Sequence, residues 1–144
     1  MIFSKSTEYA IRATMFLCLN SSGNECFKIN TIASAIDSPP FFTSKILQTL
    51  VRQNIISSTK GPNGGFYVDK KSKPIILYDL IIAVEGPDFF DKCLLGLNKC
   101  SEKNPCPLHK YFKKHKEELK QLFKKKSVSD IMTENNNGKI NLKI

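Results

Sequence analysis

The sequence has no tryptophan, only two histidines and few acids: 13 Asp and Glu stand against 22 Lys and Arg, a formal net charge of +9. It has no apolar run near the roughly 20 residues that a membrane-spanning helix needs. It also has no N-terminal stretch that resembles a secretory signal, so we expect a cytoplasmic protein with reduced thiols and no membrane span. The positive charge predicts a polyanionic partner, either nucleic acid or an acidic membrane face.

Three of the five cysteines lie close together. Cys93, Cys100 and Cys106 fall within fourteen residues, with gaps of six and five residues, and His109 follows the last of them. Asparagine and proline residues between and beside them indicate a loop rather than a continuous helix. Because a loop can wrap several thiolates around one centre, we expect a metal centre here, with an iron–sulfur cluster as the first hypothesis.

Three other interpretations of these cysteines remain open. Buried free thiols are common, but here the neighbours are Lys, Asn, Glu and Ser, which do not form a core. The odd count of five disfavours a disulfide framework. Zinc sites usually contain a tighter pair of cysteines, whereas iron–sulfur sites accept wider gaps. A cluster therefore ranks first, with zinc and a metal-free site as equal alternatives.

The first half of the chain predicts a helix-turn-helix. Helical spacing of apolar residues predicts helices over 6–20, 30–36 and 41–53, and the Asp-Ser-Pro-Pro sequence at 37–40 separates the second from the third. The third helix has an apolar face and a polar, basic face, as a DNA-reading helix does. The residues expected to face outward are Thr43, Ser44, Lys45, Gln48 and Arg52. Taken alone the pattern is weak, because many solvated helices have a polar face.

A hairpin is predicted directly after the third helix. Strands are expected over 55–59 and 66–68, joined by the glycine-rich turn at 60–65. A basic hairpin in this place predicts the wing of a winged helix-turn-helix, in which Lys60 and the loop amides meet phosphates. The glycines do not indicate a nucleotide-binding loop, because that loop opens a helix and a strand follows here.

The last third of the chain predicts one long amphipathic helix, over about 107–126. Its apolar stripe consists of Leu108, Tyr111, Phe112, Leu119, Leu122 and Phe123. The stripe must be buried. The sequence leaves open whether it packs on its own domain or on a second copy. The asparagine-rich segment that follows predicts a frayed tail.

Several short motifs together are specific, although none is so alone. They are Tyr9–Ala13, Ile32–Ala33, Lys45–Leu50, Ser58–Phe66, Ile82–Gly86, the three cysteines and Cys106–Leu108. In this combination the sequence resembles the IscR/NsrR/CymR-type winged-helix regulators of bacteria over about residues 1–130. The resemblance implies a mainly α fold with a small β-hairpin wing and a long C-terminal dimerisation helix.

The resemblance further implies a homodimer that binds a palindromic operator in double-stranded DNA. The expected parts are a DNA-binding winged helix-turn-helix domain (1–86), a cysteine-bearing cluster loop (87–109), a dimerisation helix (107–130) and a flexible tail (131–144). The expected DNA-binding residues are Ser4, Lys5, Tyr9, Ser38, Phe42, Thr43, Ser44, Lys45, Gln48, Arg52, Lys60, Gly61, Asn63, Gly64 and Gly65.

Family members with three cysteines resemble iron–sulfur sensors that respond to nitric oxide, redox state or iron–sulfur status. Cys93, Cys100 and Cys106 then carry over as ligands of a 2Fe–2S or 4Fe–4S cluster, although the first gap is one residue longer than the family spacing. The fourth ligand has two candidates. His109 occupies the position used in the Isc regulator, and Glu8 occupies the position of a carboxylate that nitric-oxide-sensing members supply from the other subunit.

Two alternatives to a cluster-controlled repressor are kept. One is a metal-free repressor of the same fold whose cysteines respond to oxidants. The other is a protein of a different class that carries a cluster for assembly or electron transfer, against which the basic wing and the +9 charge argue. An enzyme is not expected, because the sequence shows no constellation of nucleophile and base.

Overall fold

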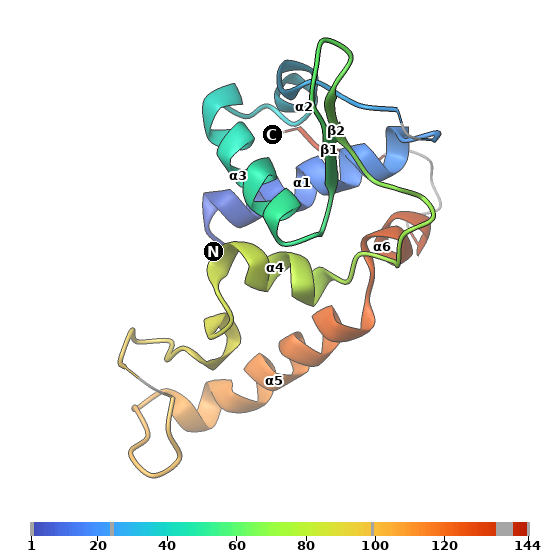
Figure 1. The fold of residues 1–144 in the computed structure, drawn as a ribbon. Coiled ribbons are helices and arrows are strands. Elements are labelled where there is room, and N and C mark those ends of the chain that lie inside the picture. The colour runs from blue at the N-terminus through green and yellow to red at the C-terminus, as the bar shows by residue number, and fades with distance from the viewer. Residues whose placement is uncertain (1, 24, 99, 135–139, 144) are drawn as a thin grey trace.

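The computed structural model describes residues 2–23, 25–98, 100–134 and 140–143 (Figure 1). The elements in chain order are α1 (Lys5–Asn20), α2 (Ile29–Ala35), α3 (Pro40–Arg52), β1 (Ser57–Thr59), β2 (Gly65–Tyr67), α4 (Leu77–Glu85), the 3-10 helix η1 (Phe89–Asp91), α5 (His109–Lys125) and α6 (Val128–Glu134). The predicted class, mainly α with a β-hairpin wing, is confirmed. Most helix bounds lie one or two residues from the predicted ones. In the described ranges, we find no helix with the length and apolar character of a membrane span.

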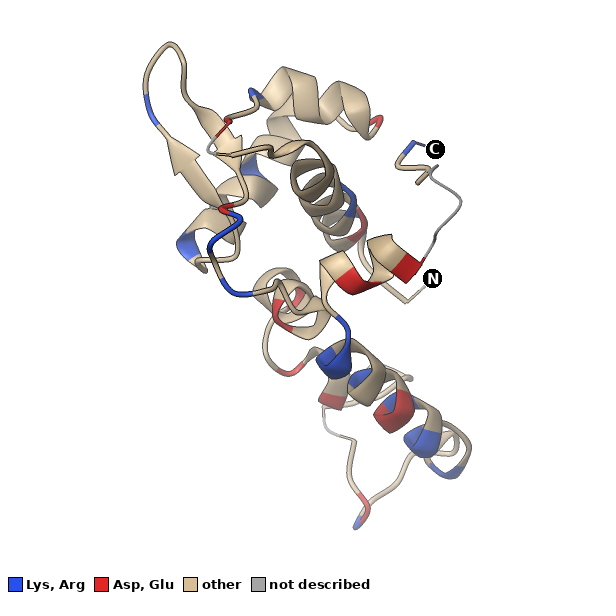
Figure 2. Cartoon of the chain, turned by 90° about the vertical axis from the view of Figure 1, so that its right-hand side faces the viewer, with Lys and Arg blue, Asp and Glu red and all other residues tan. Residues whose placement is uncertain are grey.

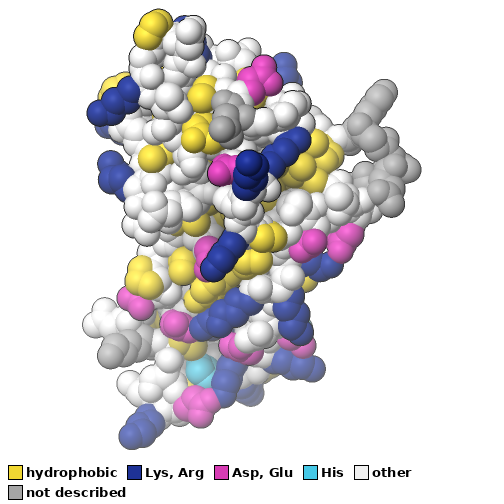
Figure 3. Space-filling model, turned by 45° about the vertical axis from the view of Figure 1, so that its right-hand side comes forward, with side chains coloured by type: hydrophobic (Ala, Val, Ile, Leu, Met, Phe, Trp, Pro, Cys, Tyr) yellow, Lys and Arg dark blue, Asp and Glu magenta, His cyan; other side chains and the backbone are white. Residues whose placement is uncertain are grey.

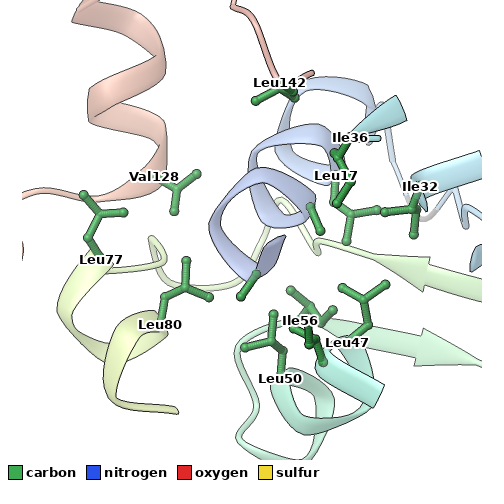
Figure 4. Close-up of a cluster of buried hydrophobic side chains, with 13 residues drawn as sticks. Leu17, Ile32, Ile36, Leu47, Leu50, Ile56, Leu77, Leu80, Val128 and Leu142 are labelled. Atoms are coloured by element: carbon green, nitrogen blue, oxygen red, sulfur yellow. The ribbon is translucent and has the colours of Figure 1, made fainter. Parts of the chain in front are cut away.

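The core is built around α1. Ala10, Ala13 and Leu17 are completely buried along one face of this helix, and the two alanines let its neighbours approach closely. Leu50 of α3 and Leu80 of α4 pack against that face (Figure 4). Each fully buried leucine contributes about 1.5–3 kcal/mol. Because α3 and α4 pack on α1 and also on each other, the three helices form one packed unit.

The predicted helix-turn-helix is formed by α2 and α3. Ile36 closes α2 and is fully buried, and Asp37 takes a left-handed backbone with φ 49°. Pro40 then occupies the first turn of α3, where a missing N–H costs nothing. These features fix a short turn, so α3 begins on the surface.

The hairpin lies close to the backbone of Phe27, and glycine is required at the point of contact. Its strands pair antiparallel, with Ser57 opposite Tyr67. Phe66 in β2 exchanges two backbone hydrogen bonds with Phe27, at N···O distances of 2.8 and 2.9 Å. A Cβ on Gly65 would lie 2.4 Å from the carbonyl oxygen of Phe27. Only glycine permits this approach.

The C-terminal region differs from the flexible tail expected over 131–144. Residues up to Glu134 belong to α6, whose first residue Val128 is fully buried and donates its N–H to Ile75 O at 2.8 Å. Further on, Leu142 is also buried, and it belongs to the same core (Figure 4). The part of the expected tail at 135–139 lies outside the described residues. The described parts are therefore packed, because apolar side chains anchor both ends.

Candidate functional site

The outer face of α3 is polar and basic at its middle and end. Lys45, Gln48 and Arg52 are exposed. Phe41 is 75% exposed, and the Lys45 ammonium lies over its ring at 4.4 Å from the centroid. Ser44 is half-buried beside Gln48. This face therefore presents hydrogen-bond donors and cations, the kinds of group with which a helix meets a DNA groove.

Thr43 does not belong to that face, which corrects the prediction. Its side chain is fully buried, and its hydroxyl donates to Pro39 O at 2.8 Å and lies 2.6 Å from the hydroxyl of Ser38. The pair closes the first turn of α3 instead of facing solvent. Ser38 itself is half-buried.

The hairpin loop divides into an open half and a packed half. Lys60, Gly61 and Asn63 are exposed. Gly64, in contrast, is buried, and a Cβ there would lie 2.1 Å from the carbonyl oxygen of Thr59. Gly64 and Gly65 therefore allow the close packing of the hairpin. Lys60 and Asn63 are the loop side chains that remain accessible to a ligand.

The N-terminus of α1 presents two more of the predicted residues. Ser4 and Lys5 are exposed, and Ser4 caps the helix by accepting the N–H of Thr7 at 3.3 Å. Tyr9 is half-buried and packs edge-on against Phe42 of α3, with ring centroids 5.9 Å apart. Through that contact α1 supports the start of α3, the helix predicted to read DNA.

The three cysteines and His109 line one pocket of about 500 Å³ below the winged body. Cys93 is buried, and Cys100 and Cys106 are half-buried. The Cys100 sulfur lies 3.2 Å from His109 Nδ1, at the first residue of α5. The loop therefore brings together the residues that the sequence spacing predicted.

The pocket favours the thiolate form of Cys93. The backbone N–H of Leu95 lowers the pKa of this thiol most, burial opposes the shift, and the Cys106 side chain and the charge of Lys116 reinforce it. Lys92 and Lys113 also line the pocket. By contrast, burial alone raises the pKa of Cys18 to about 11, so that thiol is inert.

The donor set fits a thiolate-bound group, although it is not closed around one ion. Within the described ranges, no three His, Cys, Asp or Glu side chains form a group that could hold a metal ion. Three soft thiols with an imidazole are ligands of iron–sulfur clusters and of zinc. Glu8 stands apart on α1, where its carboxylate pairs with Lys5 at 2.7 Å, and it does not line the pocket.

Helix α5 extends from the winged body, which it contacts through α4 and η1, and none of its residues is fully buried (Figure 1). Lysines predominate along it, with the adjacent Glu117 and Glu118 near its middle. Figure 2 shows these basic and acidic positions on the helix, and Figure 3 shows charged side chains beside apolar patches on the lower half of the surface. Only part of the predicted apolar stripe is packed against the rest of the protein. Phe123 packs against Phe3 and Phe90, whereas Tyr111 and Leu122 are 64% and 49% exposed.

Two sets of residues escaped the sequence analysis. Phe41 is one of the most exposed large apolar side chains. Its position outside the apolar stripe of 41–53 could have indicated this exposure. The second set is the lysines of the pocket: Lys116 donates to Lys92 O at 3.3 Å. Their sequence separation gave no sign of this proximity.

Comparisons with known proteins agree with this architecture. A family model described as "Rrf2: Iron-dependent Transcriptional regulator" matches residues 3–134. A predicted HTH-type transcriptional regulator of Aquifex aeolicus is 32% identical over 134 residues, which cover 92% of each chain.

Solved structures share the fold at low identity. CymR, the global cysteine regulator of B. subtilis, superposes with a TM-score of 0.71 at 14% identity, over 92% of this chain and 97% of CymR. T. potens IscR gives 0.68 at 13% identity, over 96% of this chain and 90% of IscR. The family and these relatives are regulators of transcription, not enzymes. The chain belongs to the Rrf2 family of winged-helix transcriptional regulators.

Proposed function

We propose that this regulator is a homodimeric repressor whose operator affinity is set by an iron–sulfur cluster bound in the cysteine pocket. The observation that carries the proposal is the convergence of three thiols and His109 at the junction between α5 and the winged body. The family description, which names iron-dependent regulators, supports it. The cluster type, 2Fe–2S or 4Fe–4S, stays open.

We propose Cys93, Cys100 and Cys106 as ligands and His109 as the fourth. The 3.2 Å contact between Cys100 and His109 supports a ligand set within one subunit. Glu8 is the alternative and would have to come from the partner subunit. A bound cluster would supply a centre that reacts with nitric oxide or changes oxidation state, and the lysines of the pocket would offset its negative charge.

The DNA half of the proposal places α3 in the major groove and the hairpin loop beside the phosphates. The proposed contacts are Ser4, Lys5, Tyr9, Ser38, Phe42, Ser44, Lys45, Gln48, Arg52, Lys60, Gly61 and Asn63, without the buried Thr43. Gly64 and Gly65 enter only by shaping the loop. Phosphate contacts dominate affinity, so every comparison needs one fixed salt concentration.

The dimer is proposed to form through α5, with residues 107–130 as its segment. Tyr111 and Leu122 leave an apolar edge uncovered, and a two-fold axis would bury both copies together. Since the pocket lies at the root of α5, a change there would alter the spacing of the two recognition helices. Half-site spacing is a geometric requirement of a dimer on DNA.

Anaerobic purification tests the cluster. The visible absorbance, iron and acid-labile sulfide are measured for the wild type, His109→Ala and Glu8→Ala, with His115→Ala as a control histidine outside the ligand set. We expect iron and sulfide in near-equal amounts, and their loss in the variant that removes the fourth ligand. Zinc, or no metal, would refute the cluster.

Operator binding tests the switch. Gel shifts with duplex DNA from upstream of the protein's own gene compare the cluster-bearing and cluster-free forms at the same salt. We expect the two affinities to differ. Equal affinities would show that the cluster does not control binding, even if it is present.

A metal-free thiol switch is the second candidate. The side chains of Cys93 and Cys106 interact directly, so a two-electron oxidant such as a peroxide could join them in a disulfide while it takes up their two electrons and two protons. Mass spectrometry of iron-free, peroxide-treated protein decides this. A cross-linked peptide that contains both residues, with altered DNA affinity, supports it; unchanged thiols exclude it.

A further inference from the structure

The N-terminal arm, Ile2–Ser4, touches the cysteine pocket and the DNA-binding body at once. Ile2 lines the pocket that contains the three cysteines. The ring of Phe3 lies 6.0 Å from that of Phe89 and 5.6 Å from that of Phe123. Ser4 then caps α1. Three consecutive residues thus connect the pocket wall to the first turn of α1.

Glu85 holds the end of this arm in place. It is the last residue of α4, just before the segment that leads to Cys93. Its carboxylate Oε1 accepts the backbone N–H of Ser4 at 2.9 Å and the hydroxyl of Thr7, which is fully buried, at 2.7 Å. An acceptor with negative charge satisfies a free amide at the positive end of α1. The start of α1 is therefore fixed to the end of α4.

Packed aromatic rings fill the space between the arm and the pocket. Phe90 is buried, and its ring lies 5.0 Å from Phe89, 5.3 Å from Tyr78 and 5.9 Å from Phe123. Phe89 and Phe90 also line the cysteine pocket. Because packed interiors leave little free volume, a displacement of the pocket wall has to move these rings or the arm.

On its far side α1 meets the recognition helix. Tyr9 lies one helical turn beyond Lys5 and packs on Phe42 near the start of α3. A shift of the first turn of α1 would reach the exposed Ser4 and Lys5 directly and α3 through Tyr9. The contacts thus link the wall of the cysteine pocket, through the arm and α1, to the proposed DNA-binding surface.

We infer that Phe3 and Glu85 are positioning residues that couple the cysteine pocket to the DNA-binding face within one subunit. The inference deepens the proposed function and rests on it in treating the pocket as the sensing site. It assigns the coupling to the arm and to the end of α4, in addition to any change in the spacing of the two subunits.

The test needs no iron. Reduced, iron-free protein in a Cys26→Ser background is modified with N-ethylmaleimide at Cys100 and Cys106, and mass spectrometry verifies the modified sites. Affinity for DNA from upstream of its own gene is measured before and after modification at one salt concentration. The variants Phe3→Leu and Glu85→Ala are compared with Glu85→Gln, which keeps an acceptor oxygen, and with Phe16→Leu, which disturbs a ring pair of α1 away from the pocket.

We expect modification to change the wild-type affinity by about 5- to 150-fold, the usual range of coupling between two sites. In Phe3→Leu and Glu85→Ala, the affinities before and after modification should differ by no more than about twofold. Glu85→Gln and Phe16→Leu should keep the wild-type difference. The inference would be overturned if modification changed the affinity of Phe3→Leu as much as that of the wild type, or if it left the wild-type affinity unchanged. If Glu85→Ala does not fold, Phe3→Leu decides. Iron and sulfide analysis judges the cluster separately.

Discussion

The C-terminal segment should contribute measurably to stability, although it was expected to be flexible. Leu142 is buried in the core, and its carbonyl oxygen accepts a hydrogen bond from Arg12 Nη1 at 3.0 Å. The same nitrogen donates to Ile36 O at 2.7 Å, at the end of α2. Arg12 thus joins the chain end to the helix-turn-helix, and it also lies over the Tyr9 ring at 5.0 Å.

The magnitudes can be worked from these contacts. A hydrogen bond from a charged donor contributes about 1.5–3 kcal/mol, and the lower end applies here because water can replace a donor at a half-exposed site. Arg12→Ala should therefore cost about 3 kcal/mol for its two bonds. Leu142→Ala should cost about 2 kcal/mol, the low end for a buried leucine, because a chain end can relax.

A double-mutant cycle separates a real link from two independent losses. If Leu142→Ala releases the segment, the bond to Arg12 is lost as well, so the double variant should be about 1.5 kcal/mol more stable than the sum predicts. Urea unfolding followed by circular dichroism at one protein concentration measures this, with Arg12→Lys as the control that keeps the charge. Additivity within about 0.5 kcal/mol would refute the link.

Three further predictions concern Lys60 in the hairpin loop, Gly65 in β2 and Glu85 at the end of α4. Lys60→Ala should weaken DNA binding and lower the slope of log K against log salt by about 0.9, whereas Lys103→Ala on the cysteine loop should leave the slope unchanged; titrations at several salt concentrations measure this. Gly65→Ala should destabilise the protein by more than about 2 kcal/mol, because the added Cβ would clash with a backbone carbonyl. Gly23→Ala is the control, because a Cβ there would have no atom within 4 Å. A decrease in melting temperature of similar size in both variants would contradict the packing argument. At Glu85, burial raises the pKa but hydrogen bonds outweigh it, so the pKa lies below its ordinary 4.5 and its stabilisation is present above that pH and lost as pH falls through the folded value. Urea midpoints of the wild type should therefore drop below about pH 4.5 more steeply than those of Glu85→Gln, and parallel curves would exclude this role.

The sequence predicted α1, α2, α3, α5 and the wing because each carries a strong local signal, whereas α4 was not predicted. Pro39 and Pro40 set the start of α3, and the apolar period of 41–53 set its inner face. Thr43 was misplaced because periodicity classes it as polar, while its hydroxyl is satisfied by the backbone one turn earlier. Leu142 was missed because its burial depends on contacts with α1, about 130 residues away in the chain.

The candidate site was predictable in its residues but not in its neighbours. The spacing of the cysteines in a loop was enough to predict that they come together. The contribution of Phe3 and Glu85 was not predictable, because the arm and the end of α4 are about 80 residues apart and meet only in the fold. Nor did the sequence choose between His109 and Glu8, since each fits a family position.

The divided hairpin loop also determines where the proposed phosphate contacts can change over evolution. Gly64 and Gly65 are fixed by backbone atoms that leave no room for a side chain. Lys60 and Asn63 face solvent and make no contact with the core. Substitutions at these two positions, like those on the outer face of α3, carry little cost in stability. In the proposed complex, where the loop lies beside phosphates, affinity for DNA can therefore change at the loop while the packed half keeps the hairpin in place.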